Sequence, residues 1–313
     1  MKHSLRELLL RPVALLACTA LLGWPLVPVG RSADANPAPA AASRAWRERA
    51  FVVGQAPRQV IELVRASSRP FQAEPFYERF TRRYRGVPYG AATAAMLRGF
   101  KEGHTLVNFE SMDCVTFLEN YLATALTCRQ ADALPQPPAD SWILETFLLN
   151  LERVRYVGGQ NCTWEDRIYY FTQALEELES QGLLQDIGAM AGQPFRKPIH
   201  YLSSNKTKYP GIRDWKRIAR YETQLSQASL HWYPLDRIEN YATVAQSGDL
   251  VALATDVKGL DVSHCGLIHV HEGALYFTHA SSVKKQVVYQ QDLADYLSKR
   301  TSITGLFVYR PLF

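Results

Sequence analysis

The sequence lacks the patterns that mark several common classes of protein. It has neither a CxxC pair nor an HExxH motif, so its cysteines and histidines do not have the spacing of a zinc site, and we expect no metal and no cofactor. It has no basic run interleaved with aromatic residues, and its net charge is only +5, so we expect no nucleic-acid partner. No internal repeat is present. A composition with 47% hydrophobic residues is typical of a globular protein.

Apolar residues form a long run only at the N-terminus. A basic start, MKHSLRELLLR, is followed by PVALLACTALLGWPLVPVG and then by small residues, ADA at 33–35. This order is typical of an export signal, so we predict a signal peptide over 1–35, a Pro/Ala-rich linker over 36–44 and one domain over 45–313. LLAC also resembles a lipoprotein box ending at Cys18, and an uncleaved anchor is the third alternative. All three place the domain outside the cytoplasm, in the periplasm or secreted, and we expect a membrane partner only if Cys18 carries a lipid anchor.

The rest of the chain divides into a helical first part and a strand-rich last third. Helical spacing of apolar residues extends over 44–82, 114–126, 141–152 and 165–182, whereas 185–213 look irregular. Short β-branched and aromatic runs predict strands at 249–255, 262–270, 274–280, 286–290 and 305–310. Helices followed by an antiparallel sheet predict an α+β fold.

Four cysteines remain once the predicted signal peptide is removed: Cys114, Cys128, Cys162 and Cys265. A setting outside the cytoplasm permits disulfides, and Cys128–Cys162 is the most suitable pair. Two free or buried thiols are the alternative, and the sequence leaves both open.

Cys114 stands out by its position in SMDCVTFLENYLATAL. Asp113 is a suitable N-cap, so the cysteine would occupy the first turn of the helix over 114–126. Unpaired backbone N–H groups and the helix dipole favour a thiolate there, and the same N–H groups can stabilise an oxyanion. Buried packing is the plain alternative for a cysteine in this place.

Strand alternation identifies a base for such a nucleophile. A two-residue turn after the strand over 262–270 would pair His271 with Ala274, which places His264 and His279 on one face of adjacent strands. Cys265 should point away from His264, so we do not expect it to be the nucleophile. Cysteine, base and orienting group then form the arrangement of a covalent hydrolase. Two separately satisfied sheet histidines are the alternative.

The chain also resembles a known family. MDCVTFLEN, then GDLVAL, GLDVSHCGLI and HASS, occur in an order similar to that of the N-acetylmuramoyl-L-alanine amidase-like family, a branch of the NlpC-type papain-like cysteine hydrolases. The resemblance covers roughly 75–313. It implies a papain-like α+β fold, with the cysteine helix packed on an antiparallel sheet and extra N-terminal and mid-chain helices. It also implies hydrolysis of the amide between the lactyl group of N-acetylmuramic acid and L-alanine in muropeptides.

Carried over to this sequence, the resemblance makes Cys114 the nucleophile, His264 the base and His279 the polarising third residue. Tyr89, in GVPYG, matches a position near the substrate. The sequence departs from the family in having Cys265 where an aliphatic residue is usual, and AAT at 91–93 in place of AGT.

Three further residues precede the nucleophile closely enough to contact substrate: Asn108, Ser111 and Asp113, the last as a cap first and an electrostatic partner second. The predicted partners are therefore peptidoglycan fragments. An endopeptidase that cuts within the stem peptide and a murein-binding protein without turnover are the two alternative functions. The chain has no separate wall-binding repeat, which favours small soluble muropeptides as substrates.

Overall fold

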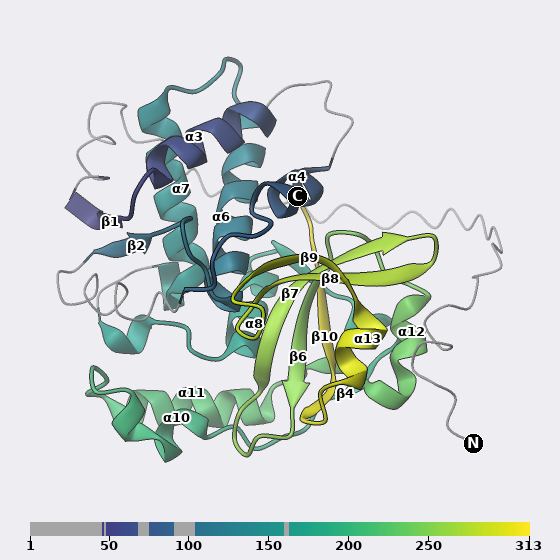
Figure 1. The fold of residues 1–313 in the computed structure, drawn as a ribbon. Coiled ribbons are helices and arrows are strands. Elements are labelled where there is room, and N and C mark those ends of the chain that lie inside the picture. Colours follow the sequence, from purple (N-terminus) through teal and green to yellow (C-terminus); the bar gives the residue numbers. More distant parts are fainter. Residues whose placement is uncertain (1–45, 47, 68–74, 91–103, 160–162) are drawn as a thin grey trace, which may run out of the picture.

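The computed structural model describes residues 46, 48–67, 75–90, 104–159 and 163–313. The predicted signal peptide and linker, and the AAT segment, lie outside the described residues. The described chain has a mixed α+β fold, in which an antiparallel sheet carries helices on both faces (Figure 1). Among these residues, no helix is both long enough and apolar enough to cross a membrane.

The sheet has eight strands in the order β4-β5-β10-β6-β7-β8-β9, with β3 also paired to β10, and every pairing is antiparallel. The five predicted strands are confirmed. The three strands missing from the prediction, β3, β4 and β5, are short pieces of two to four residues. The strands span Leu184–Asp186 (β3), Gln193–Pro194 (β4), His231–Pro234 (β5), Leu250–Thr255 (β6), Val262–His271 (β7), Ala274–Ser281 (β8), Gln286–Asp292 (β9) and Ile303–Pro311 (β10).

A tight hairpin joins β7 to β8 in the predicted register, with His271 opposite Ala274. Both turn residues have positive φ, 49° at Glu272 and 77° at Gly273. Two left-handed residues give a turn whose twist matches the flanking strands. The hairpin therefore fixes which side chains of β7 and β8 share a face.

The long helix α6, Cys114–Asp132, lies beside α7 (Asp140–Arg155), and α3 (Ala56–Ser67) packs against both (Figure 1). It extends one and a half turns beyond the prediction. Side chains from Thr116 to Cys128 are all buried, because helices cover one side of α6 and the sheet covers the other. We predicted apolar residues on a single face of this helix. A helix that is buried on all sides does not need to separate an apolar face from a polar one.

The prediction of successive helical segments over 44–82 is wrong for the first segment. Ala50–Val52 form strand β1, which pairs in parallel with β2, Thr105–Val107. Gly54, with φ of 56°, follows this strand and leads into α3. Parallel pairing with a segment about fifty residues away cannot be read from local spacing. Helix α4, Phe76–Arg83, agrees with the prediction.

The predicted helix over 165–182 is also shorter in the structure. Only α8, Phe171–Ser180, is helical, because Asp166 closes a capping box with Thr163 around the single turn η2 and Arg167 is extended. Helix α11, Trp215–Gln227, was not predicted. The remaining short elements are η1 Val157–Gly159, α9 Gly188–Ala191, α10 Tyr201–Ser204, η3 Lys206–Lys208, η4 Leu235–Arg237, α12 Ile238–Ala242 and α13 Leu293–Ser298.

The two faces of the sheet bury different clusters. Ala252, Cys265 and Phe307 belong to the large core shared with α6. Val251 and Phe277 lie in a second core that includes residues of α12 and α13. The nucleophile helix and α13 thus pack on opposite faces of β7 and β8, and the site lies where side chains from both faces meet.

Candidate active site

Cys114 is the first residue of α6, and its place is set by a capping box. The Thr116 amide donates to Asp113 Oδ1 at 2.8 Å, and the Asp113 amide donates to Thr116 Oγ1 at 2.9 Å. Burial and the neighbouring Cys114 raise the pKa of Asp113. Asp113 therefore acts as the predicted cap, and it holds the partly exposed cysteine at the start of the helix.

Asn108 and Ser111 shape the turn that leads to the nucleophile. Asn108 Oδ1 accepts from the amides of Glu110, at 2.9 Å, and Ser111, at 3.3 Å. Its Nδ2 donates to Ser111 Oγ at 3.2 Å, and Asn120 on α6 donates to its carbonyl oxygen at 2.8 Å. Both residues are thus engaged in fixing the loop to the helix. Their contact with substrate stays a prediction.

Tyr89 lies close enough to Cys114 for the two groups to interact electrostatically, and its predicted contact with substrate stays a prediction. Its amide donates to the Lys285 carbonyl at 2.8 Å, and Met112 donates to the Pro88 carbonyl at 3.1 Å, so this segment bridges β9 and the loop before Cys114. Burial raises the pKa of Tyr89 to about 12, and the charge of Cys114 adds to the rise. The phenol therefore stays neutral and can donate a hydrogen bond beside the thiol.

His264 and His279 are in contact, which confirms their predicted common face. His264 Nε2 lies 2.6 Å from His279 Nδ1. His279 is 1% exposed, and its ring stacks on Phe277 at 4.6 Å between ring centres. Burial, with His264 as a further cause, lowers the pKa of His279 to about 3. His279 is therefore a neutral imidazole at ordinary pH.

Gln291 completes this chain of side chains, and the sequence analysis missed it. Its Oε1 lies 3.2 Å from His279 Nε2. An amide oxygen only accepts, so His279 Nε2 carries the proton and His279 Nδ1 accepts from His264 Nε2–H. In a neutral His264 ring, Nδ1 is then the nitrogen that can accept a proton. The predicted strand ended at 290, one residue before Gln291. The prediction therefore did not place Gln291 on the strand beside His279.

The sulfur of Cys114 has two neighbours that stabilise its thiolate. Hydrogen bonding with the Cys265 thiol, and then with His264, lowers the pKa of Cys114 well below its usual value in spite of burial. Cys265 Sγ also lies 3.3 Å from the Cys114 carbonyl oxygen. Burial and the adjacent Cys114 raise the pKa of Cys265, so it remains a thiol donor. Its contact with Cys114 was not predicted, because strand alternation does not show where α6 packs.

Tyr296 of α13 is a second residue that the sequence analysis missed. Its ring lies 6.1 Å from that of His264 at 19° and 5.0 Å from that of His279. The Arg300 guanidinium lies 3.8 Å from the same ring. Burial raises the pKa of Tyr296 to about 12. This buried aromatic ring limits the positions that the two imidazoles can adopt.

Cys128 does not join the site. Cys128 is a buried free thiol, so the alternative with a Cys128–Cys162 disulfide is not observed, and Cys162 lies outside the described residues. Burial raises the pKa of Cys128 to about 12. Within the described part of the chain, no three His, Cys, Asp or Glu side chains are grouped to hold a metal ion.

The structure thus brings together a cysteine at a helix end and two histidines in contact, the second of them buried. The sequence model of the AmiA-like family, N-acetylmuramoyl-L-alanine amidase-like, matches residues 79–304. The chain belongs to this family. Its members are amidase-like peptidoglycan hydrolases, so the chain is an amidase-like hydrolase with peptidoglycan as the substrate class. A search of the curated proteins finds no match to the chain.

Solved structures share the fold. A Bacteroides fragilis protein provisionally described as a xylanase is 28% identical, with a TM-score of 0.63 over 74% of this chain and 99% of that chain. An N-acetylmuramoyl-L-alanine amidase from Bacteroides uniformis is 24% identical, with a TM-score of 0.60 over 75% of this chain and 98% of that chain. Protein LPG0564 from Legionella pneumophila is 18% identical, with a TM-score of 0.56 over 87% and 97%. The last two show similarity of fold alone.

Proposed function

We propose that this AmiA-like protein is a cysteine-dependent N-acetylmuramoyl-L-alanine amidase. It would cut the amide between the lactyl group of N-acetylmuramic acid and L-alanine in muropeptides. It would work outside the cytoplasm, after export by the N-terminal signal, in a fold of the papain-like NlpC type. One observation supports this proposal most: a cysteine at a helix N-terminus is linked to two histidines in hydrogen-bond contact, the second of them buried and neutral.

The first step uses the ring nitrogen of His264 that the hydrogen bonds to His279 and Gln291 leave free to accept a proton. His264 Nδ1 takes the proton of the Cys114 thiol, and the Cys265 thiol helps to hold the resulting thiolate. The sulfur attacks the lactyl carbonyl carbon and forms a C–S bond, while the carbonyl π electrons move to oxygen. Backbone N–H groups in the first turn of α6 stabilise that oxyanion. The neutral Tyr89 phenol is placed to donate to the same region.

Collapse of the tetrahedral intermediate then breaks the C–N bond. His264 returns its proton to the leaving amine of L-alanine, so a free peptide departs and a thioester remains on Cys114. A water molecule next loses a proton to His264 and attacks the thioester carbon. Collapse of this second tetrahedral intermediate breaks the C–S bond, and His264 returns its proton to the sulfur. The products are the muramyl carboxylic acid and the restored Cys114 thiol. His279 orients His264 throughout and stays neutral, because its pKa is held at about 3.

Glycoside cleavage, which the description of the Bacteroides fragilis relative suggests, is less suited to this site. It normally uses two carboxylates on opposite sides of the scissile bond. Here the groups that surround the candidate nucleophile are thiol, imidazole and phenol, and Asp113 is engaged in its capping box. Amide hydrolysis matches the groups that are present.

Mass spectrometry of the products from one defined muropeptide tests the proposal. The wild-type protein should release a free peptide that begins with L-alanine and an intact muramyl sugar. Cys114→Ala and His264→Ala should both reduce the rate by several orders of magnitude. His269→Ala is the matched control, since His269 bonds the Tyr77 hydroxyl at 3.3 Å and lies outside the chain of catalytic groups. Muramyl-L-alanine as a product would indicate a stem-peptide endopeptidase instead.

A further inference from the structure

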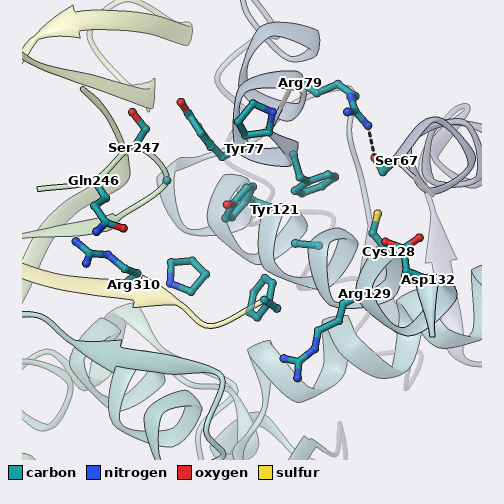
Figure 2. Close-up of a pocket in the computed structure, with 16 residues that line it drawn as sticks. Ser67, Tyr77, Arg79, Tyr121, Cys128, Arg129, Asp132, Gln246, Ser247 and Arg310 are labelled. Atoms are coloured by element: carbon teal, nitrogen blue, oxygen red, sulfur yellow. Dashed lines mark hydrogen bonds between the residues drawn. The ribbon is translucent and has the colours of Figure 1, made fainter. Parts of the chain in front are cut away.

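A second cavity lies away from Cys114, beside the C-terminal half of α6 (Figure 2). Its volume is about 570 Å³, within the range of small-molecule sites. Its walls come from the start of α4, the second half of α6, the turn before β6 and the end of β10. Tyr121, its nearest lining residue along the helix, is seven positions beyond Cys114, or about 10 Å. None of the catalytic side chains described above lines it.

Tyr121 presents a polar group to this cavity. The residue is 4% exposed, and its hydroxyl reaches into the open space (Figure 2). Among the described residues, no hydrogen-bond partner is found for that hydroxyl. Burial raises its pKa, so it is a neutral donor and acceptor. Phe76 stacks on the ring at 5.6 Å and 29°, which fixes the direction of the hydroxyl. A hydroxyl that is held in place and faces the cavity can bond a polar group of a ligand there.

Charged and neutral polar groups share the cavity wall. Arg310 forms two bonds to the fully buried carboxylate of Asp249, at 2.7 and 3.0 Å. Arg129 and Asp132 face the cavity from one helix and carry opposite charges, and Arg79 bonds the Ser67 hydroxyl at 2.8 Å. The neutral groups suit a ligand with hydroxyl or amide groups, to which the side chain of Gln246 on the opposite wall can bond.

Part of the wall is apolar and partly aromatic: Pro75, Phe76, Pro311 and Phe313. A sugar ring combines an apolar C–H face with hydroxyls that donate and accept, so it suits rings and a tyrosine hydroxyl together. We propose that this cavity binds N-acetylated amino-sugar rings of a glycan chain, at a distance from the bond that is cut. The choice of an amino sugar rests on the proposed function, since peptidoglycan strands consist of such rings.

A remote sugar site would act through effective concentration. A glycan held at Tyr121 would keep its neighbouring muramyl units close to Cys114. Binding of such a unit at Cys114 would then occur within one complex and at a high effective concentration. Long glycans would then be cut at lower concentration than single muropeptides. A muropeptide too short to reach both sites would gain nothing. The proposed site therefore predicts a preference for long glycans over short ones. The rate of the chemical step itself should not change.

Calorimetric titration of the full-length Cys114→Ala protein with the linear trimer of N-acetylglucosamine tests the site directly. We expect saturable binding that Tyr121→Phe weakens about three- to tenfold, because one hydrogen bond is lost. Tyr309→Phe is the matched control. Its hydroxyl is also buried without a partner among the described residues, but it does not line the cavity. Maltotriose, which has no N-acetyl groups, should bind more weakly.

Three results would overturn the proposal: no saturable binding of the trimer, equal binding by the Tyr121→Phe and unchanged proteins, or binding of inorganic phosphate in place of the sugar. Hydrolysis of a single muropeptide is measured separately, and Tyr121→Phe should leave it unchanged. Sugar binding that depends on Tyr121 without any hydrolysis would refute the proposed function and keep the site. Hydrolysis without sugar binding would refute the sugar site and keep the proposed function.

Discussion

His264 Nε2 lies 2.6 Å from His279 Nδ1, and the second imidazole is in turn 3.2 Å from Gln291 Oε1. The three side chains form one directional series of hydrogen bonds that starts at an amide oxygen. Since each bond fixes the proton position of the next ring, Gln291 determines which nitrogen of His264 is free to accept a proton. Gln291 thereby acts, through His279, on the imidazole beside Cys114.

Gln291→Leu should lower kcat about tenfold and leave KM nearly unchanged, because the His279 tautomer is no longer fixed. Steady-state kinetics on a muropeptide measure both constants. Gln286→Leu is the control, since it makes the same change on an exposed residue of the same strand. Equal kcat values for Gln291→Leu and wild type would refute the directional series.

His279→Ala should cost more activity than Gln291→Leu and less than His264→Ala. The orienting ring holds the base but does not itself accept the Cys114 proton. Rates of the three variants on one substrate give this order. A His279→Ala protein that is as inactive as His264→Ala would assign His279 a direct part in proton transfer.

Cys265→Val should raise the pKa of Cys114, because the thiol that donates to its sulfur is removed. Alkylation of Cys114 by iodoacetamide, followed over pH by peptide mass spectrometry, reports the thiolate fraction. The curve should move to higher pH in the variant. Cys128→Ala removes a buried thiol away from the site and should not move the curve. An unchanged curve in Cys265→Val would contradict the role given to Cys265.

His279 should make stability depend on pH between about 3 and 6.5. Its pKa is about 3 when folded and about 6.5 in the unfolded chain, so the unfolded chain binds more protons in this window. Its contribution is fully present above pH 6.5, and it is lost by about 1.4 kcal/mol per pH unit as pH falls. Denaturant unfolding at several pH values measures this slope.

His279→Gln should reduce the slope, whereas His271→Gln, at an exposed histidine of the same hairpin, should leave it as in wild type. If the unfolding free energy changes with pH by the same slope in wild type, His279→Gln and His271→Gln, the pKa of His279 is not lowered by folding.

The helix that carries the nucleophile is held by a buried ion network. Glu119 on α6 lies 2.8 Å from Arg155 and 2.6 Å from Arg167. Arg155→Met should lower the free energy of unfolding by about 3–5 kcal/mol, since it removes one of the two guanidinium groups that pair with a buried carboxylate. Urea unfolding measures the loss. Arg65→Met breaks an exposed pair with Asp140 and should cost at most about 1 kcal/mol. Similar losses of unfolding free energy in both variants would contradict the claim that the buried ion network stabilises α6 more than an exposed pair does.

Local sequence rules predicted the part of the site that depends on one hairpin. Alternation along β7 and a two-residue turn were enough to place His264 and His279 on a common face. Asp113 was equally local, because a cap needs only the next three residues. These features are set by neighbours in sequence, so the structure confirmed them.

The missed residues depend on contacts between distant segments. Gln291 reaches His279 past a register shift in the β8–β9 pairing, where Gln290 adopts a φ of 52°. The contact between Cys265 and Cys114 requires the docking of α6 on β7, and Tyr296 requires α13 on the other face. Neither the shift nor the docking leaves a periodic signal in the sequence, so pattern reasoning could not find these three residues.

The central claim is that Cys114 attacks the lactyl carbonyl. Rapid acid quenching of the wild-type protein with a defined muropeptide, followed by intact-protein and peptide mass spectrometry, traps and locates the acyl-enzyme. The account predicts a thioester on Cys114 whose added mass is that of the muramyl acyl group without any amino acid. An adduct that retains L-alanine or more of the stem peptide, or one that maps to a residue other than Cys114, would contradict it.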